Sequence, residues 1–118
     1  MIRVTYCRKD HCLIVEGHAL SGEVGHDLVC ASASMLTYTL AAFIENVRDA
    51  GKMATETKIQ LQEGYAELSC TVKRSYDCTI ALVFDAMCAG FDMLAQSYPE
   101  NVKYEIINYM RDRKEKQD

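Results

Sequence analysis

The sequence predicts a single α+β domain, built as a mainly antiparallel sheet from two hairpins and a C-terminal strand, with two helices, in the order ββαββαβ. The chain has 118 residues, of which 49% are hydrophobic, and this is enough for one core but too little for two domains. Two pairs of short strand-like segments are each joined by a polar turn, and two longer segments repeat apolar residues at helical spacing. We expect the domain to cover residues 1–110, followed by a solvated, frayed polar C-terminal tail at 111–118.

The first hairpin is predicted from residues 2–7 and 12–19, which are apolar and rich in β-branched side chains. A polar turn at residues 8–11 separates them. His18 falls at the end of the second of these strands. The sheet would hold this imidazole in place while leaving it free to face the loop that follows.

The first helix is expected to begin near Asp27, a favoured N-cap residue, because Gly22 and Gly25 interrupt regular structure just before it. Gly51 is the candidate C-terminal cap. Between these points apolar residues recur at helical spacing: Leu28, Ala31, Met35, Leu36, Leu40, Phe43, Ile44 and Val47.

The second half of the chain repeats the pattern. Strands are expected at 55–61 and 65–73, joined by a turn at Glu63 and Gly64. The second strand should bury one face, made of Ala66, Leu68, Cys70 and Val72. A helix near 77–97, stopped by Pro99, and a last strand at 102–108 complete the prediction.

His18 and Cys30 are the candidate catalytic pair. A thiol attacks as the thiolate, so a catalytic cysteine needs a base and a positive local field. If Asp27 is the N-cap, Cys30 is the third helical residue, among unpaired backbone N–H groups that favour the thiolate and would later receive an oxyanion. His18 lies across the glycine-bearing loop and would be the base.

These residues carry a family resemblance. The run Gly17-His18-Ala19, a short glycine loop, then residues 25–31 (GHDLVCA) and Ser34 resemble the signature of the ribosomal-processing cysteine protease family called Prp. The resemblance spans nearly all of the chain. It implies a catalytic dyad of His18 and Cys30, and removal of an N-terminal extension from the precursor of bacterial large-subunit ribosomal protein L twenty-seven. It also implies a homodimer, and neither a cofactor nor a metal is expected.

Other residues of the motif have supporting roles. Ser34 matches the family pattern one helical turn beyond Cys30, where it would hydrogen-bond within the site. Asp27 is interpreted as a cap, or alternatively as a group that orients His18. His26 is a competing base. With Gly22 and Gly25 it belongs to a loop expected to close over a substrate peptide.

A zinc site is the chemical alternative, because Cys7 and Cys12, with His11 beside them and His18 and His26 downstream, supply ligands of the kind zinc prefers. The spacing is poor, since neighbouring residues of an extended hairpin point to opposite faces. No second closely spaced ligand pair completes a tetrahedral set.

Charge argues against direct nucleic-acid binding. Thirteen Lys and Arg against seventeen Asp and Glu give a net charge of −4, which suits a basic peptide better than a phosphate backbone. The chain has no signal-like N-terminus and no uninterrupted apolar run of bilayer-crossing length, so we expect a cytoplasmic protein without a membrane partner. A non-enzymatic, ribosome-associated binding module is the alternative function.

Overall fold

The computed structural model describes residues 1–17, 24–55 and 57–117, and within them the side chains of all but 24–27 and 114–117. The strands and long helices follow the predicted order, and one further helix ends the chain. The elements are β1 (Ile2–Cys7), β2 (Cys12–Glu16), α1 (Val24–Asp49), β3 (Lys58–Gln62), β4 (Tyr65–Ser69), the short 3-10 helix η1 (Arg74–Tyr76), α2 (Asp77–Ser97), β5 (Val102–Ile107) and α3 (Met110–Gln117).

The sheet has five strands in the order β3-β4-β2-β1-β5. Both predicted hairpins are present, and β2 also pairs with β4 in the antiparallel sense. Two strands end well before their predicted ends: β2 ends at Glu16, before the glycine at position 17, and β4 ends at Ser69. The pairing of β5 with β1 is parallel, and it joins Ile2 to Val102 in register. The prediction of a mainly antiparallel α+β sheet is therefore confirmed. Strands β3 and β5 are its edges.

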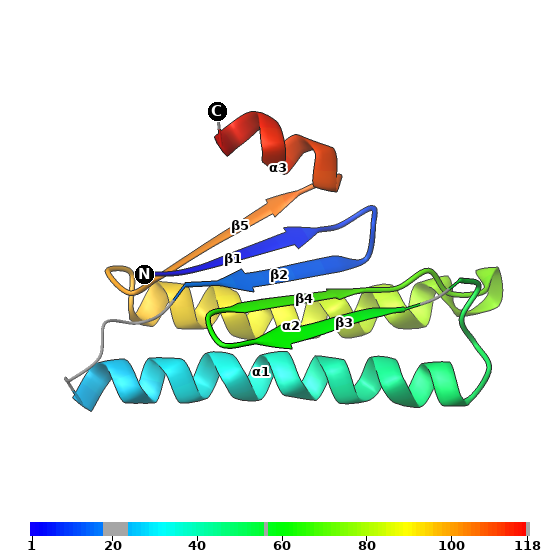
Figure 1. Ribbon diagram of the computed structural model, residues 1–118, viewed down its shortest axis with the longest axis horizontal. Coiled ribbons are helices and arrows are strands. Elements are labelled where there is room, and N and C mark those ends of the chain that lie inside the picture. The colour runs from blue at the N-terminus through cyan, green and yellow to red at the C-terminus, as the bar shows by residue number, and fades with distance from the viewer. Residues whose placement is uncertain (18–23, 56, 118) are drawn as a thin grey trace.

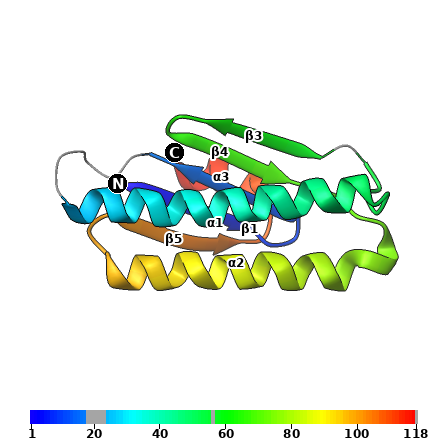
Figure 2. The same cartoon turned by 90° about the horizontal axis from the view of Figure 1, so that it is seen from below.

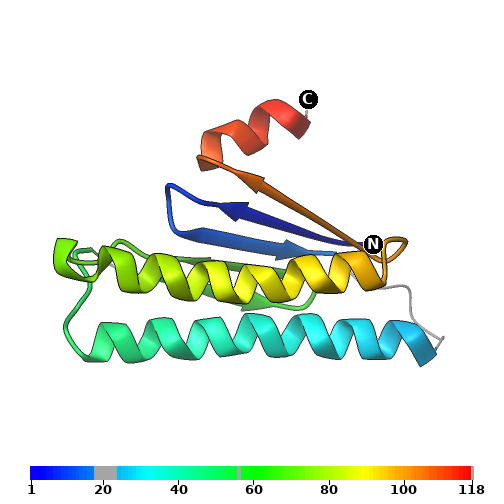
Figure 3. The same cartoon turned by 180° about the vertical axis from the view of Figure 1, so that it is seen from behind.

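The two long helices lie side by side on one face of the sheet, and α3 lies on the other face (Figures 1, 2 and 3). The main core lies between the sheet and the long helices, and its largest side chains include Phe84, Phe91, Leu40, Ile44 and Leu68. A smaller cluster on the α3 side consists of Cys7, Cys12, Ile14 and Ile107, with Tyr65 and Met110 packed against it.

The helices α1 and α2 are each long and apolar enough to cross a membrane by length and composition alone. Helices that form the core of a packed domain pass the same test, and both of these helices place a row of buried side chains against the sheet. Several large apolar side chains of these helices are exposed: Leu28, Met35, Tyr38, Leu82 and Met93.

Helix α1 ends as the sequence predicts. Gly51 has a φ of +75°, its N–H donates to the carbonyl of Arg48, and the N–H of Lys52 donates to the carbonyl of Val47. These two bonds form a Schellman cap, whose left-handed residue is usually glycine. The helix start is different, because α1 begins at Val24 rather than near Asp27. An acidic residue is favoured within the first helical turn as well as at the N-cap, so Asp27 fits either position.

The C-terminal tail also differs from the prediction, because residues 110–117 form the helix α3. The N–H of Met110 donates to Asp10 Oδ2 at 2.8 Å, and the Arg113 guanidinium donates to Glu16 Oε1. The partners of helix α3, Asp10 and Glu16, lie about 100 positions earlier in the chain. Local sequence patterns do not reveal contacts over such a distance.

Candidate active site

A cleft of about 260 Å³ lies where the middle of the sheet, helix α1 and the β3–β4 turn meet. Helix α1 contributes Cys30 and Ser34, β1 contributes Ile2, and Gly17, the residue after the end of β2, also lines the cleft. The residues of the hairpin turn form the opposite wall: Leu61, Gln62, Glu63, Gly64, Tyr65 and Ala66. Three residues of the sequence motif, Gly17, Cys30 and Ser34, thus line one cleft.

Cys30 has a half-buried, free thiol, and Ser34 is exposed one turn further along the same helix. Residues four apart share a helix face, so both side chains border the cleft. The predicted position of Cys30 at the helix start is wrong, since it is the seventh residue of α1. The N–H groups that have no partner within this helix belong to its first turn, which precedes the thiol. The Cys30 N–H lies beyond that turn, where the donors to an oxyanion were expected.

Gly17 fixes the chain where it enters the cleft. Its φ is +93°, and its N–H donates to the carbonyl of Gly64 at 2.9 Å. A Cβ atom built at Gly17 would lie 2.2 Å from the carbonyl oxygen of Met1, a distance that real Cβ atoms do not show. Only glycine fits this position, which immediately precedes His18 in the sequence.

The remaining residues of the motif lie partly outside the described structure. His18 and Gly22 are outside the described residues. Gly25, His26 and Asp27 belong to the first turn of α1 by their backbone, and their side chains are not described. The contact between the His18 imidazole and the Cys30 thiol therefore stays a prediction. The same holds for the roles of His26 and Asp27.

The hairpin wall of the cleft was not predicted as part of the site. Thr37 and Tyr38 of α1 face the cleft together with the turn of β3 and β4. Thr37 is buried, and its hydroxyl donates to the carbonyl of Ala33 at 2.7 Å, whereas Tyr38 is exposed. The helical periodicity places these two residues near Ser34, but the approach of the hairpin is a long-range contact with no local signal.

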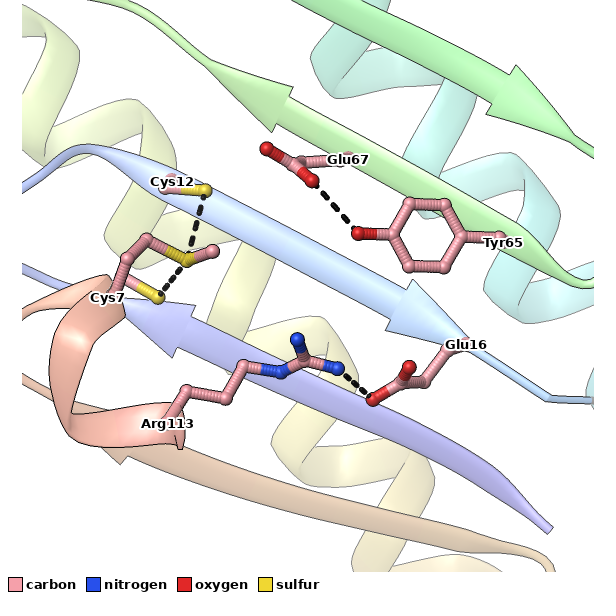
Figure 4. A network of polar contacts seen from close by, with 7 residues as sticks. Cys7, Cys12, Glu16, Tyr65, Glu67 and Arg113 are labelled. Carbon is pink, nitrogen blue, oxygen red and sulfur yellow. Dashed lines mark hydrogen bonds and ion pairs between the residues drawn. The ribbon is translucent and has the colours of Figure 1, made fainter. Parts of the chain in front are cut away.

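A polar group on the other face of the sheet braces this hairpin (Figure 4). The Tyr65 hydroxyl donates to Glu67 Oε1 at 2.7 Å, and Lys58 Nζ lies 2.9 Å from Glu67 Oε2, across from β4 on β3. Burial and the bond to Glu67 raise the pKa of Tyr65 to about 12. Burial acts to raise the pKa of Glu67, but the hydrogen bonds from Lys58 and Tyr65 hold it below its usual range.

Among the residues of the zinc alternative, the three with described side chains, His11, Cys7 and Cys12, do not converge. The His11 ring lies 6.0 Å from that of Phe84, on the helix side of the sheet, whereas Cys7 and Cys12 contact Met110 on the α3 side. Within the described ranges, no group of three His, Cys, Asp or Glu residues is placed to hold a metal ion.

A free, half-buried thiol in a cleft meets one requirement of nucleophilic catalysis by cysteine, which is access of a substrate to the sulfur. Comparison with known proteins gives the family. The model of the cysteine protease Prp family matches residues 1–103, and the chain belongs to this family. No curated protein matches the sequence.

Solved structures share the fold. The crystal structure of SMU.848 from Streptococcus mutans is 29% identical, covers 91% of this chain and 94% of its own, and has a TM-score of 0.72. The essential ribosomal processing protease Prp from S. aureus, solved with a substrate peptide, is 22% identical with a TM-score of 0.69. Its complex with a covalently linked product peptide is 23% identical with a TM-score of 0.67. Both S. aureus structures cover 91% of this chain and 100% of their own.

Proposed function

We propose that this protein is an endopeptidase that uses Cys30 as nucleophile and His18 as base. The observation that carries the proposal is the shared cleft: the thiol of Cys30 and the residue preceding His18, Gly17, both line it. Gly17 packs against the Met1 carbonyl without room for a side chain, and His18 follows it directly in the sequence.

In the proposed mechanism the base takes the thiol proton, and the thiolate attacks the scissile carbonyl carbon. The C–N bond then breaks, the leaving amine takes the proton from the imidazolium, and a thioester remains on Cys30. Water, deprotonated by the same imidazole, hydrolyses the thioester and releases the new carboxylate. Ser34 would hydrogen-bond within the site, and backbone N–H groups around the cleft would hold the oxyanion.

The proposed substrate is the precursor of large-subunit ribosomal protein L twenty-seven, cleaved after its N-terminal extension. Family membership supports a peptide substrate, and the S. aureus relative is a ribosomal processing protease that holds such a peptide. The net charge of −4 favours encounter with a basic ribosomal protein terminus. We place this reaction in the cytoplasm, where ribosomal proteins are made.

An extended substrate would bind by adding a strand to β3. This strand is an edge of the sheet, and its last residues, Leu61 and Gln62, line the cleft. Main-chain bonds to an edge strand give affinity with little demand on side chains. A substrate complex without such main-chain bonds would contradict this part of the proposal.

The test is incubation of the purified chain with the precursor, followed by sequencing of the new N-terminus. Cys30→Ala and His18→Ala should each remove cleavage while leaving the fold intact. Cys78→Ala is the matched control, because Cys78 is a free, exposed thiol that does not line the cleft, and it should cleave at the normal rate. Full turnover by Cys30→Ala would reject the nucleophile, and precursor binding without cleavage by the unmodified chain would favour a ribosome-associated binding module.

We also propose that the protein forms a homodimer through the outer face of its two long helices. A groove of about 570 Å³ runs between α1 and α2, and Met35 and Met93, both more than 60% exposed, border it. Apolar surface of this kind is typical of a protein–protein contact, and a two-fold axis would bring one such face against its copy.

A further inference from the structure

Three sulfur atoms meet on the α3 side of the sheet, away from the proposed active site. The Cys7 thiol donates to the Met110 thioether at 3.2 Å, and the Cys12 thiol donates to the same atom at 3.7 Å. Figure 4 shows Cys7 and Cys12 on neighbouring strands, and they are direct partners in the β1–β2 ladder. The three side chains come from β1, β2 and α3, so the cluster exists only in the folded chain.

From this juxtaposition we infer that Cys7, Cys12 and Met110 form a binding site for a soft monovalent metal ion, Cu(I). Thiolate and thioether are the ligands that Cu(I) prefers, and the site has no imidazole or carboxylate among its three converging donors. Zinc takes four ligands, most often with nitrogen or further thiolates, and so fits the set less well.

The separations of the two thiol sulfurs from the Met110 sulfur are close to those of a three-coordinate ion. Metal–sulfur bonds of about 2.3 Å in a trigonal site place the sulfurs about 4 Å apart. The observed separations of 3.2 and 3.7 Å need to open by less than an ångström. Both thiols are at most 2% exposed and Met110 is half-buried, so the ion would enter past Met110 and then be shielded from water.

The surroundings hold the ligands in place. The Met110 N–H donates to Asp10 Oδ2 at 2.8 Å, and Arg113, one turn along α3, donates to Glu16 of β2. Such supporting contacts orient ligands before the ion arrives.

Binding of the ion displaces the protons of both thiols, because cysteine binds a metal as the thiolate.

The experiment titrates Cu(I) alone into the full chain carrying Cys30→Ala and Cys78→Ala, which removes the two thiols that are not buried. The work is done without oxygen, against a coloured Cu(I) chelator. We expect one Cu(I) per chain, and X-ray absorption showing three sulfur neighbours at about 2.3 Å. Zn(II) in excess should not displace it.

Two substitutions test the ligands. Met110→Leu keeps the volume of the side chain and should weaken Cu(I) binding by at least about tenfold, with one sulfur neighbour lost. Met87→Leu, on the partly buried methionine of α2 that packs against the main core, is the matched control and should leave binding unchanged. Cys12→Ala should abolish binding, with thermal unfolding used to verify that the chain stays folded.

Four results would overturn the inference. These are failure to compete with the chelator, equal binding by Met110→Leu and the unsubstituted background, displacement by Zn(II), or a disulfide between Cys7 and Cys12 without retained copper. The last would mean that the cross-strand pair is a redox couple instead. None of these results depends on peptidase activity, so the outcome is separate from that of the proposed function.

Discussion

Gly17 carries two constraints that no other residue type meets, a φ of +93° and a backbone neighbour where a Cβ atom would lie. We predict that Gly17→Ala lowers the free energy of unfolding by about 2–4 kcal/mol, because a steric clash adds to the cost of a left-handed backbone. Urea denaturation measures this loss. Cleavage should fall as well, because the segment leading to His18 would be displaced.

Gly51→Ala is the control for the backbone term alone. Gly51 has a φ of +75°, but nothing lies within 4 Å of a Cβ atom built there. Its loss should be only about 1 kcal/mol. Equal losses at the two glycines would show that the contact with Met1 relaxes without cost.

The cysteines should separate by reactivity. Cys70 and Cys88 are buried, and burial raises their pKa to about 11 and about 12, so almost no thiolate forms at neutral pH. We predict that brief treatment with iodoacetamide modifies Cys30 and Cys78 and leaves Cys70 and Cys88 unmodified until the chain is denatured. Peptide mass mapping gives the order.

A substrate peptide adds a second comparison within the same experiment. It should protect Cys30, which lines the cleft, and leave Cys78 as reactive as before. Protection of both thiols, or of neither, would argue against binding of the peptide in this cleft.

At the scale of elements, the β3–β4 hairpin forms one wall of the cleft, and the pair of Lys58 and Glu67 links its two strands. The folded-state pKa of Glu67 is lowered, so its contribution to stability is complete above the unfolded value of about 4.3 and is lost as the pH falls through the lower folded value. We predict that Glu67→Gln is less stable than the unsubstituted chain at neutral pH, and that the difference shrinks below about pH 4. Denaturation at a series of pH values measures it, with Glu100→Gln as an exposed control. A difference that grows in acid would contradict the assignment.

A helix or strand could be predicted from the sequence where the residues that fix it lie within it or next to it. The bounds of α2 match the prediction because Pro99 and the apolar repeat lie within or next to the helix. The start of α1 was misplaced because an acidic residue such as Asp27 is favoured both at the cap and inside the first turn. Helix α3 was missed because Met110 and Arg113 find their partners on β2 and its preceding turn, far away in sequence.

The candidate site was likewise predictable only where neighbouring residues in the sequence determine it. Cys30 and Ser34 could be paired from helical spacing alone, whereas the opposing wall near Gly64 could not, because it depends on how the second hairpin folds over α1. Gly17 belongs to the sequence motif, but the reason that only glycine fits there is not local. The Met1 carbonyl lies beside Gly17 only when β1 and β2 are paired.

For the whole molecule, the prediction concerns association through the outer face of the long helices. Met35→Glu and Met93→Glu each place a charge in the groove between α1 and α2 and should shift the protein from dimer to monomer. Light scattering coupled to gel filtration measures the mass. Ile106→Glu changes an exposed apolar residue of β5 outside the groove and should leave the dimer intact. A monomeric unsubstituted chain, or dissociation by all three changes alike, would contradict the proposed interface.

The parallel pairing of β1 with β5 has a consequence for how the chain is made. Ile2 and Val102 are neighbours in the sheet although a hundred residues of synthesis separate them. Until the last strand emerges from the ribosome, β1 presents an open edge, and a product halted after α2 would keep an unpaired, apolar strand exposed to other nascent chains. Prematurely terminated copies of this protein should therefore aggregate rather than accumulate as partly active enzyme.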